Sequence, residues 1–447
     1  MATTSPYLRR LCLSLAIGCA AVGAFAADKD AVRGTPHPAM SFSLAEYGYR
    51  PVNSAMALRL GYANATIHFV DPSHVLLTYS THKLLPRLRD QREGDDDHAV
   101  RALVLHLPDG KVVHETEWRM HDRTSYLWPL TKGRFLLRLR SDLYAIDPLG
   151  SRAAEHLGEQ QLLQTGAELQ GIEFSPQRDM LLVQTAPAPM IGDDPREKKE
   201  SPVTGSFYQV VDAPGGGVRL RLRGNTESKD AFSLAFTSMG VLQTMREDRT
   251  HWAFDFHAFD GTSVELAGFT STCKPSSYFL SDAEFFSLGC RGGEDRKLMA
   301  GFNLMAEANW VFTTDDAPLW LAVATAPGAG RFAVRNTLAA HPDTRETDQL
   351  APDDIRQQEV RVYGMREGFE ILRVQTSPAQ KPGQNFALSP DGLRLAVLHG
   401  TQLEVYDLPP VSKEDRVMFG KEEEALKALR PAAEGPMGVK VTGGKRD

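Results

Sequence analysis

Acidic residues and histidines gather in three long segments of the chain, and these side chains have the clearest potential for chemistry. Carboxylates suit a hard cation such as calcium, and histidine can ligate a metal or move a proton. Residues 82–100 hold His82, Asp95, Asp96, Asp97 and His98; residues 187–206 hold Asp193 and Asp194; residues 337–356 hold His341, Asp343, Asp353 and Asp354. They are the candidate binding residues.

The spacing within these segments matches no catalytic or metal-binding motif. The acidic run at Asp95–His98 lacks the alternating ligands and the bend glycine of a calcium loop. The thirteen histidines form no HxH or HExxH pattern, and the chain has no GxSxG, Walker, GxGxxG or CxxCH motif. Solvated acidic loops and exposed histidines remain the alternative interpretation. We therefore expect no bound metal, no cofactor and no catalytic constellation that the sequence can identify.

The stretch Phe386–Pro409 predicts the kind of element that must position these segments. Ser389-Pro390-Asp391-Gly392 is typical of a turn, because proline fixes φ and glycine supplies a positive φ. The alternating apolar residues from Leu393 to Val397 indicate a strand, and Leu403–Tyr406 indicates another. The stretch therefore reads as three short strands joined by tight turns.

Similar hairpins recur along the chain. The best copy is Ile172–Thr185, in which Phe174, Ser175 and Pro176 align with Leu388, Ser389 and Pro390. Looser copies begin at Phe69, Leu127, Phe232, Tyr278 and Leu319, which gives about seven copies, roughly 45 to 60 residues apart. A second hairpin follows nearly every copy, starting at Val104, Leu143, Tyr208, Phe254, Phe302 and Val360. Four short strands per repeat predict an all-β fold, a single propeller of seven four-stranded blades.

The SPDG turn, the strand after it and the run LEVYDLP resemble the WD-repeat-like superfamily, including YVTN-type and quinoprotein amine dehydrogenase-like propellers. The resemblance covers about Met56 to Pro409. The GH…WD signature of true WD repeats is absent, so the resemblance implies an architecture and no subfamily. Propellers of this kind serve as binding platforms, and a minority are enzymes. The five tryptophans lie in strand patterns, which favours packing between blades over a ligand platform.

The three long segments fall at one place in the repeat, between the second and third strands of the first, third and sixth blades. Equivalent connections leave a propeller on the same side, and insertions confined to one face often mark the binding face. We therefore expect a binding face built by these three connections.

The last repeat ends at Pro409-Pro410 without a fourth strand. Met56–Tyr62 is an alternating segment ahead of the first hairpin, and we expect it to complete the last blade and close the ring. An ordinary N-terminal strand packed elsewhere is the alternative. The predicted propeller then spans residues 56–411, after a leader over residues 27–55.

Both ends of the chain lie outside this propeller. Arg9-Arg10, the apolar run Leu11–Val22 and Ala24-Phe25-Ala26 fit a signal peptide over residues 1–26, which predicts a periplasmic or secreted protein. A short membrane anchor or a lipid-modified Cys19 are the alternatives, but a dozen apolar residues are too few to span a bilayer. Ser412 and Asp415 form a helix-capping pattern, Lys421–Arg430 has a helical composition, and a disordered tail is expected beyond it.

Cys273 and Cys290 are the only cysteines outside the predicted signal peptide. An even pair in an exported protein indicates a disulfide. The hairpin of Ser276–Ser281 and Glu284–Arg291 would bring the two residues nearly opposite each other. A redox pair or a metal site is the alternative, but the CxxC spacing is missing.

Composition limits the partners. The net charge of −7 opposes binding to a nucleic acid backbone, which requires a basic stripe, and no segment beyond the signal is apolar enough to span a membrane. We expect a monomeric, non-catalytic binding or scaffolding module for an unidentified protein, glycan or small molecule. The competing hypothesis is a propeller hydrolase, lactonase or lyase that uses His and Asp groups at the channel mouth. A passive envelope component is the third.

Overall fold

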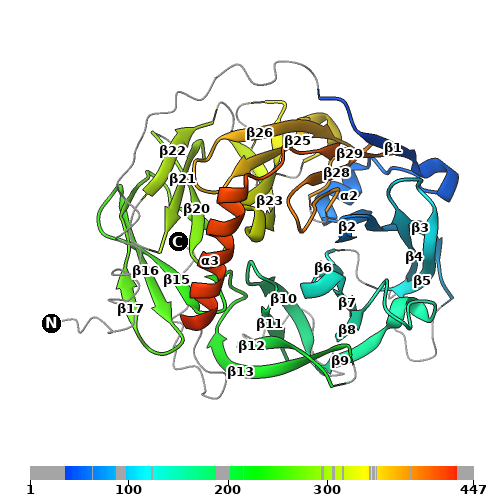
Figure 1. The fold of residues 1–447 in the computed structure, drawn as a ribbon, viewed down its shortest axis with the longest axis horizontal. Coiled ribbons are helices and arrows are strands. Elements are labelled where there is room, and N and C mark those ends of the chain that lie inside the picture. The colour runs from blue at the N-terminus through cyan, green and yellow to red at the C-terminus, as the bar shows by residue number, and fades with distance from the viewer. Residues whose placement is uncertain are drawn as a thin grey trace.

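The computed structural model describes residues 36–429 except 63, 87–96, 122–123, 188–201, 215, 293–295, 305–307, 315–316, 342–343, 345–347, 349 and 382–383. The described residues form seven antiparallel sheets arranged in a ring (Figure 1). The prediction of a single seven-bladed β-propeller is therefore confirmed. The predicted signal peptide and the tail from residue 430 lie outside the described residues.

Each sheet is one blade, and its strands follow the chain from the axis outward. Blade 1 contains β2 (Ala65–Asp71), β3 (His74–Leu84), β4 (His98–His106) and β5 (Val112–Met120). Blade 2 contains β6 (Leu127–Pro129), β7 (Phe135–Leu139), β8 (Asp142–Ile146) and β9 (Gln160–Gln164). Blade 3 contains β10 (Glu168–Phe174), β11 (Met180–Ala186), β12 (Val203–Asp212) and β13 (Val218–Ser228).

The next three blades repeat this plan, and blade 4 carries an extra strand, β18, beside β16. Blade 4 contains β14 (Ala235–Phe236), β15 (Gly240–Arg246), β16 (His251–Ala258), β17 (Ser263–Glu265) and β18 (Phe269–Thr270). Blade 5 contains β19 (Ser276–Phe279), β20 (Glu284–Gly289), β21 (Leu298–Asn303) and β22 (Ala308–Thr313). Blade 6 contains β23 (Pro318–Ala326), β24 (Arg331–Ala339), β25 (Ile355–Gly364) and β26 (Glu370–Thr376).

Blade 7 closes the ring with strands from both ends of the propeller. It contains β27 (Phe386–Leu388), β28 (Arg394–His399), β29 (Gln402–Asp407) and β1 (Met40–Ser43), and β1 pairs with β29. Short helices lie between strands: α2 (Ala55–Leu60) and the 3-10 turns η1 (Leu44–Tyr47), η2 (Thr131–Gly133), η3 (His156–Gly158), η4 (Pro327–Ala329) and η5 (Pro352–Asp354). The predicted closure by an N-terminal strand is confirmed.

The identity of the closing strand differs from the prediction. Met56–Tyr62 was expected to be that strand, but this segment contains helix α2, and β1 takes the place at the edge of blade 7. Ser54 caps α2 by accepting a hydrogen bond from the Ala57 amide at 3.4 Å, and Gly61 ends the helix with a φ of 67°. The residues between them are good helix formers without β-branching, so alternation over so short a run did not decide the structure.

Apolar side chains from neighbouring blades meet between the sheets. Between blades 7 and 1, Leu403 and Val405 share a fully buried cluster with Ile67 and Leu77, and Phe42 of β1 packs against it. Between blades 5 and 6, the indole of Trp310 stacks near Phe332 and donates a hydrogen bond to the Met365 carbonyl at 2.8 Å. These clusters bury the faces of each blade against its neighbours and hold the ring together.

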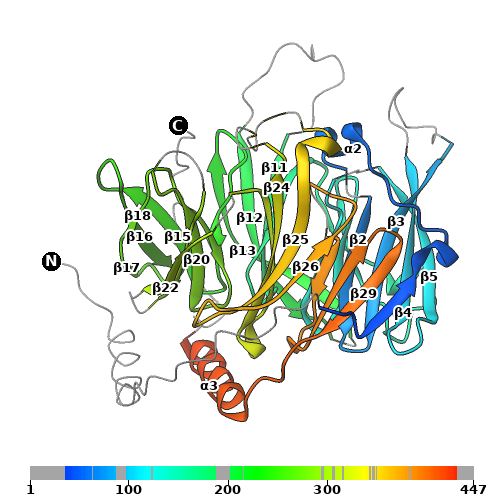
Figure 2. The same ribbon diagram turned by 90° about the horizontal axis from the view of Figure 1, so that it is seen from above.

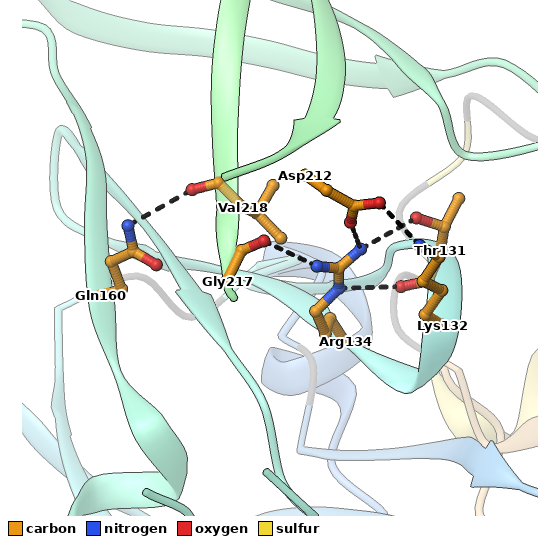
Figure 3. A network of polar contacts seen from close by, with 7 residues as sticks. All are labelled: Thr131, Lys132, Arg134, Gln160, Asp212, Gly217 and Val218. Atoms are coloured by element: carbon orange, nitrogen blue, oxygen red, sulfur yellow. Dashed lines mark hydrogen bonds and ion pairs between the residues drawn. The ribbon is translucent and has the colours of Figure 1, made fainter. Parts of the chain in front are cut away.

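Arginines at the start of second strands tie blades together at one face of the ring. Arg134 of blade 2 donates to the Gly217 carbonyl and to the Asp212 carboxylate of blade 3, each at 2.8 Å (Figure 3). Arg331 of blade 6 donates to the Gly392 carbonyl of blade 7 at 2.6 Å, and Arg394 of blade 7 donates to the Pro72 carbonyl of blade 1 at 2.8 Å. These clamps add polar cross-links to an apolar interface.

The predicted cysteine pair is confirmed as two residues within bonding distance. Cys273 and Cys290 flank the hairpin of β19 and β20, and their Cα atoms are 5.4 Å apart. Ser271 lies beside the pair and accepts hydrogen bonds from the amides of both cysteines. The bridge therefore joins the entry and exit of one hairpin in blade 5.

Replacing both cysteines by serine is expected to destabilise the protein by about 3 kcal/mol, because a cross-link over 17 residues restricts the unfolded chain. The measurement is the urea midpoint of the C273S/C290S variant against the oxidised protein. Reductant should lower the midpoint of the unsubstituted protein and leave that of the variant unchanged; a variant with the full midpoint would show that the bridge does not stabilise the fold.

Helix α3 (Lys413–Leu429) lies against one face of the ring, and α2 lies at the opposite face (Figure 2). Ser412 accepts a hydrogen bond from the Asp415 amide at 3.0 Å, which confirms the predicted cap, although the helix begins at Lys413 and not at Lys421. The Phe419 ring of α3 packs against Gly330, which lies in the turn between β23 and β24. Helix α3 therefore lies on the face of the ring where the first and second strands of each blade are joined. Among the described helices, none has the length and apolar character needed to cross a membrane.

Candidate functional site: the axial cavity

A cavity of about 440 Å³ lies on the axis of the propeller. Residues of the innermost strands, or of the segments that lead into or out of them, line it from every blade. Its walls include the aromatic side chains Tyr126, Trp128, Phe174, Phe236, Tyr278 and Phe279. The volume falls within the range typical of small-molecule sites.

The charged side chains of this cavity are mostly basic. Among the described lining residues, Arg178, Arg335 and Lys381 are basic, and Glu173 is the acidic one. The chain as a whole carries a net charge of −7, so the sign of the cavity is opposite to that of the protein. Several cations in one cavity that also has aromatic side chains in its walls are suited to an anion.

Arg178 lies in the turn between β10 and β11, where the backbone has a left-handed conformation with a φ of 60°. The corresponding residue of the SPDG turn in blade 7 is Gly392, with a φ of 65°. A left-handed conformation costs a residue with a Cβ roughly 1–2 kcal/mol, a cost that glycine avoids. The chain therefore retains an arginine where the turn favours glycine.

The guanidinium of Arg178 lies 5.3 Å from the centre of the Phe174 ring. Within the part of the chain that the structure describes, no carboxylate pairs with it and its side chain makes no hydrogen bond. Burial lowers the pKa of Arg178 to about 10, so the group stays charged at neutral pH. Its charge also contributes, after burial, to a pKa of about 3 for the enclosed His68, which is neutral.

Arg335 brings a second guanidinium to the cavity from the middle of β24. Its side chain is 1% exposed and donates hydrogen bonds to Asn385 Oδ1 at 3.0 Å and to the Lys381 carbonyl at 2.9 Å. Burial lowers the pKa of Arg335 to about 10. The Lys381 ammonium lies 5.3 Å from the centre of the Trp320 ring, so an aromatic face supports the third cation.

Glu173 connects the cavity wall of blade 3 to blade 4. Its carboxyl accepts a hydrogen bond from the Leu234 amide at 2.9 Å, and burial raises its pKa. The neighbouring Gln184 holds the same segment through hydrogen bonds with the amide and carbonyl of Phe232. Glu173 therefore has a structural role, because it joins blade 3 to the segment ahead of blade 4.

The variant Glu173→Gln is expected to be more stable than the unsubstituted protein at pH 8. Glutamine keeps an acceptor for the Leu234 amide and removes the burial cost of a charge, whereas the native carboxyl loses stability as pH rises through its raised pKa. The measurement is the urea midpoint between pH 4 and pH 8. The difference should shrink as the pH falls toward 4 and the carboxyl becomes protonated in both states; a difference that does not change with pH would contradict this explanation.

The three predicted long connections join second to third strands, as expected: β3 to β4, β11 to β12, and β24 to β25. Leu350, in the third connection, packs against Leu58 of α2, at the face opposite α3 (Figure 2). Of the candidate binding residues, Asp95, Asp96, Asp193, Asp194 and Asp343 lie outside the described residues. The binding role of this face stays a prediction.

The described candidates do not line the axial cavity. Asp97 is buried in a cationic cluster, with Arg119 at 2.5 Å and Arg140 at 2.8 Å. It therefore anchors the start of β4 and is not part of a solvated loop.

The other described candidates lie in different environments. His98 is buried beside Asp97, whereas His82, His341 and Asp353 are exposed. Asp354 accepts a hydrogen bond from the Ala351 amide at 2.7 Å and so caps η5. Within the described ranges, no three His, Cys, Asp or Glu residues form a potential metal site.

Sequence reasoning missed the residues of the axial cavity. One signal could have found Arg178: in the alignment of Ile172–Thr185 with the last repeat, it stands in the place of Gly392. The tryptophans follow the predicted packing in part, because Trp118, Trp252, Trp310 and Trp320 are buried, whereas Trp128 lines the cavity.

No protein-family model and no curated protein sequence matches the chain. Solved propellers are similar in fold. The β-propeller domain of the Trilobed protease from Pyrococcus furiosus is 11% identical, with a TM-score of 0.42, over 79% of this chain and 98% of that chain. Acylaminoacyl peptidase from Pyrococcus horikoshii is 11% identical, with a TM-score of 0.42, over 80% of this chain and 54% of that chain.

Oligogalacturonate lyase in complex with manganese is also 11% identical, with a TM-score of 0.41, over 77% of this chain and 96% of that chain. The sheet topology itself establishes the propeller, and nothing about activity or ligand is transferred from these structures.

Proposed function

We propose that this protein is a binding module that holds a small anionic molecule in its axial cavity. The observation that carries the proposal is Arg178, a charged residue kept in a turn position that favours glycine, with its guanidinium in the cavity and no acidic partner among the described residues. Unfavourable backbone geometry is commonly retained where function requires it. A bound anion would place a negative charge beside the Arg178 guanidinium, for which the described residues supply no carboxylate partner.

In this proposal the ligand enters from the face at which the second and third strands of the blades are joined. The sequence of residues 1–26 supports export of the protein to the periplasm or outside the cell. Edman sequencing of protein purified from the periplasm of a bacterial host tests export; an N-terminus at Ala27 is expected, and protein that keeps Met1 in the cytoplasm would overturn it.

The test of anion binding is isothermal titration of the purified protein with benzoate, phosphate and sulfate at low ionic strength. Benzamide serves as the neutral match for benzoate. Binding of at least one anion, weakened by added sodium chloride, is expected because screening reduces the attraction of the cations. If none of the anions binds, or if benzamide binds as tightly as benzoate, the proposal is wrong.

A propeller enzyme acting on the bound anion is the second candidate, and Glu173 is the observation in its favour. A carboxyl with a raised pKa beside a ligand could serve as a general acid. Incubation of the protein with a bound anion, followed by mass spectrometry, distinguishes the two functions. Conversion that Glu173→Gln abolishes would support the enzyme, whereas an unchanged ligand supports the binding module.

A further inference from the structure

A row of four polar side chains crosses blade 1 near the turn that joins β2 to β3. Asp71 ends β2, His74 begins β3 and His106 ends β4, and Asp109 lies in the turn that leads to β5. Asp71 is the cross-strand partner of His74, and His74 is that of His106. Cross-strand partners carry their side chains on the same side of a sheet. The order from the axis outward is therefore carboxylate, imidazole, imidazole, carboxylate.

Each imidazole is held by its own carboxylate. Nδ1 of His74 lies 2.9 Å from Oδ2 and 3.0 Å from Oδ1 of Asp71. Nδ1 of His106 lies 2.8 Å from Oδ1 of Asp109. An ionised carboxylate only accepts hydrogen bonds, so the proton of each neutral ring lies on Nδ1 and the lone pair lies on Nε2. The carboxylates thus fix the tautomer in which Nε2 can ligate a metal ion.

The two rings also have the spacing of ligands that share one ion. Because the carboxylates lie on the outer sides of the pair, each ring turns its Nδ1 edge away from the other ring and its Nε2 edge toward it. The ring centres are 5.2 Å apart, with an angle of 45° between the planes. Two imidazoles on one tetrahedral zinc ion, each with a Zn–N distance of about 2.0–2.1 Å, have ring centres roughly 5 Å apart.

The Nε2 atoms are open to a solvent ion. No described residue forms a hydrogen bond or an ion pair with the Nε2 atom of His74 or His106. The two imidazole side chains are 21% and 37% exposed. The flanking carboxylates supply negative charge beside the pair, and carboxylates that hold the far nitrogen of a ligating histidine are typical of metal sites.

We propose that His74 and His106 bind one transition-metal ion that prefers imidazole, such as Zn²⁺, through their Nε2 atoms. Asp71 and Asp109 are positioning residues, and water completes the coordination shell. Two protein ligands make this a different kind of site from a cluster of three or more, which the described ranges lack. None of the four residues lines the axial cavity, so the inference is independent of anion binding.

The test is isothermal titration of the untagged protein with zinc chloride, in excess calcium chloride to fill oxygen-lined sites. Binding of Zn²⁺ is expected, and His74→Gln and His106→Gln should each weaken it at least tenfold, because each removes one of the two ligands. His251→Gln is the matched control and should keep the affinity. Nδ1 of His251 also lies on a carboxylate three positions away, Asp248 at 2.7 Å, but no described imidazole faces its ring.

Asp109→Asn tests the positioning role. The amide oxygen can still accept from His106 Nδ1, but the charge is lost, and loss of such a carboxylate typically lowers metal affinity by about 10- to 100-fold. Lys111 pairs with Asp109 Oδ2 at 2.8 Å, so Lys111→Gln removes the same ion pair and keeps the carboxylate. Zn²⁺ affinity should fall about tenfold in Asp109→Asn and should not fall in Lys111→Gln.

A second measurement uses the unsubstituted protein and so does not depend on the folding of a variant. Zn²⁺ should protect His74 and His106, but not His251, from diethyl pyrocarbonate, as mapped by mass spectrometry. Equal modification of His74 and His106 with and without Zn²⁺ would overturn the proposal. So would a folded His74→Gln or His106→Gln variant that binds Zn²⁺ with unchanged affinity, or an equal loss of affinity in His251→Gln.

Discussion

Substituting glycine for Arg178 is expected to make the protein more stable and at the same time to weaken anion binding. Glycine relieves the left-handed backbone at a φ of 60°, worth about 1–2 kcal/mol, and removes a half-buried charge. Loss of a charged hydrogen-bond donor is worth about 1.5–3 kcal/mol, so affinity should fall by roughly 10- to 100-fold. The urea midpoint and the titration with the best-binding anion measure the two effects.

A substitution that raises stability while it lowers anion affinity indicates that the arginine serves the ligand. A substitution that lowers stability and leaves affinity unchanged indicates that the arginine serves the fold. Lys132→Gly in the corresponding turn of blade 2 relieves a similar backbone conformation and removes only an exposed ion pair with Asp212, so it should leave anion affinity unchanged. A less stable Arg178→Gly variant with full affinity would indicate that Arg178 holds the turn and not the ligand.

Removal of β1 is expected to cause the largest loss of stability. A chain that begins at Leu44 loses the strand whose four residues pair with β29, together with the packing of Met40 and Phe42 on the cluster between blades 7 and 1. Loss of such packing typically costs about 3–5 kcal/mol. The unpaired edge of β29 should also promote association, because exposed strand edges recruit other chains. Urea denaturation and size-exclusion chromatography measure both effects.

Two controls make this test specific. A chain that begins at Pro36 keeps β1 and should match the full chain in urea midpoint. Leu60→Glu alters α2 at a side chain that is 48% exposed, and it should change stability by no more than about 0.5 kcal/mol. If Leu60→Glu unfolds the protein while the chain beginning at Leu44 remains stable, then α2 and not β1 holds the ring closed.

Local sequence patterns determined the repeating part of this molecule. Turn residues such as Ser389-Pro390-Asp391-Gly392 and the alternation of apolar residues act within about fifteen residues, so the hairpins, the seven blades and the placement of the long connections could be predicted. The cysteine pair could also be predicted from local sequence, because its two residues flank one predicted hairpin.

Contacts between distant residues were decided only by the tertiary structure. Met40–Ser43 is too short to be recognised as a strand, and it becomes one because β29, about 360 residues later, offers an unpaired edge; the Ser41–Gln402 contact spans 361 positions. Met56–Tyr62 alternates like a strand, but a capping serine, a terminal glycine and the packing of Leu58 on Trp320 make it a helix.

The same distinction between local patterns and distant contacts applies to the candidate site. The sequence by itself identified acidic residues and histidines in the long connections, because such clusters are visible along the chain, and the described ones lie away from the axial cavity. Arg178, Arg335 and Lys381 are isolated in the sequence, in three different repeats. Only closure of the ring brings them to one cavity, since a propeller gathers the inner strands of all its blades around a single axis.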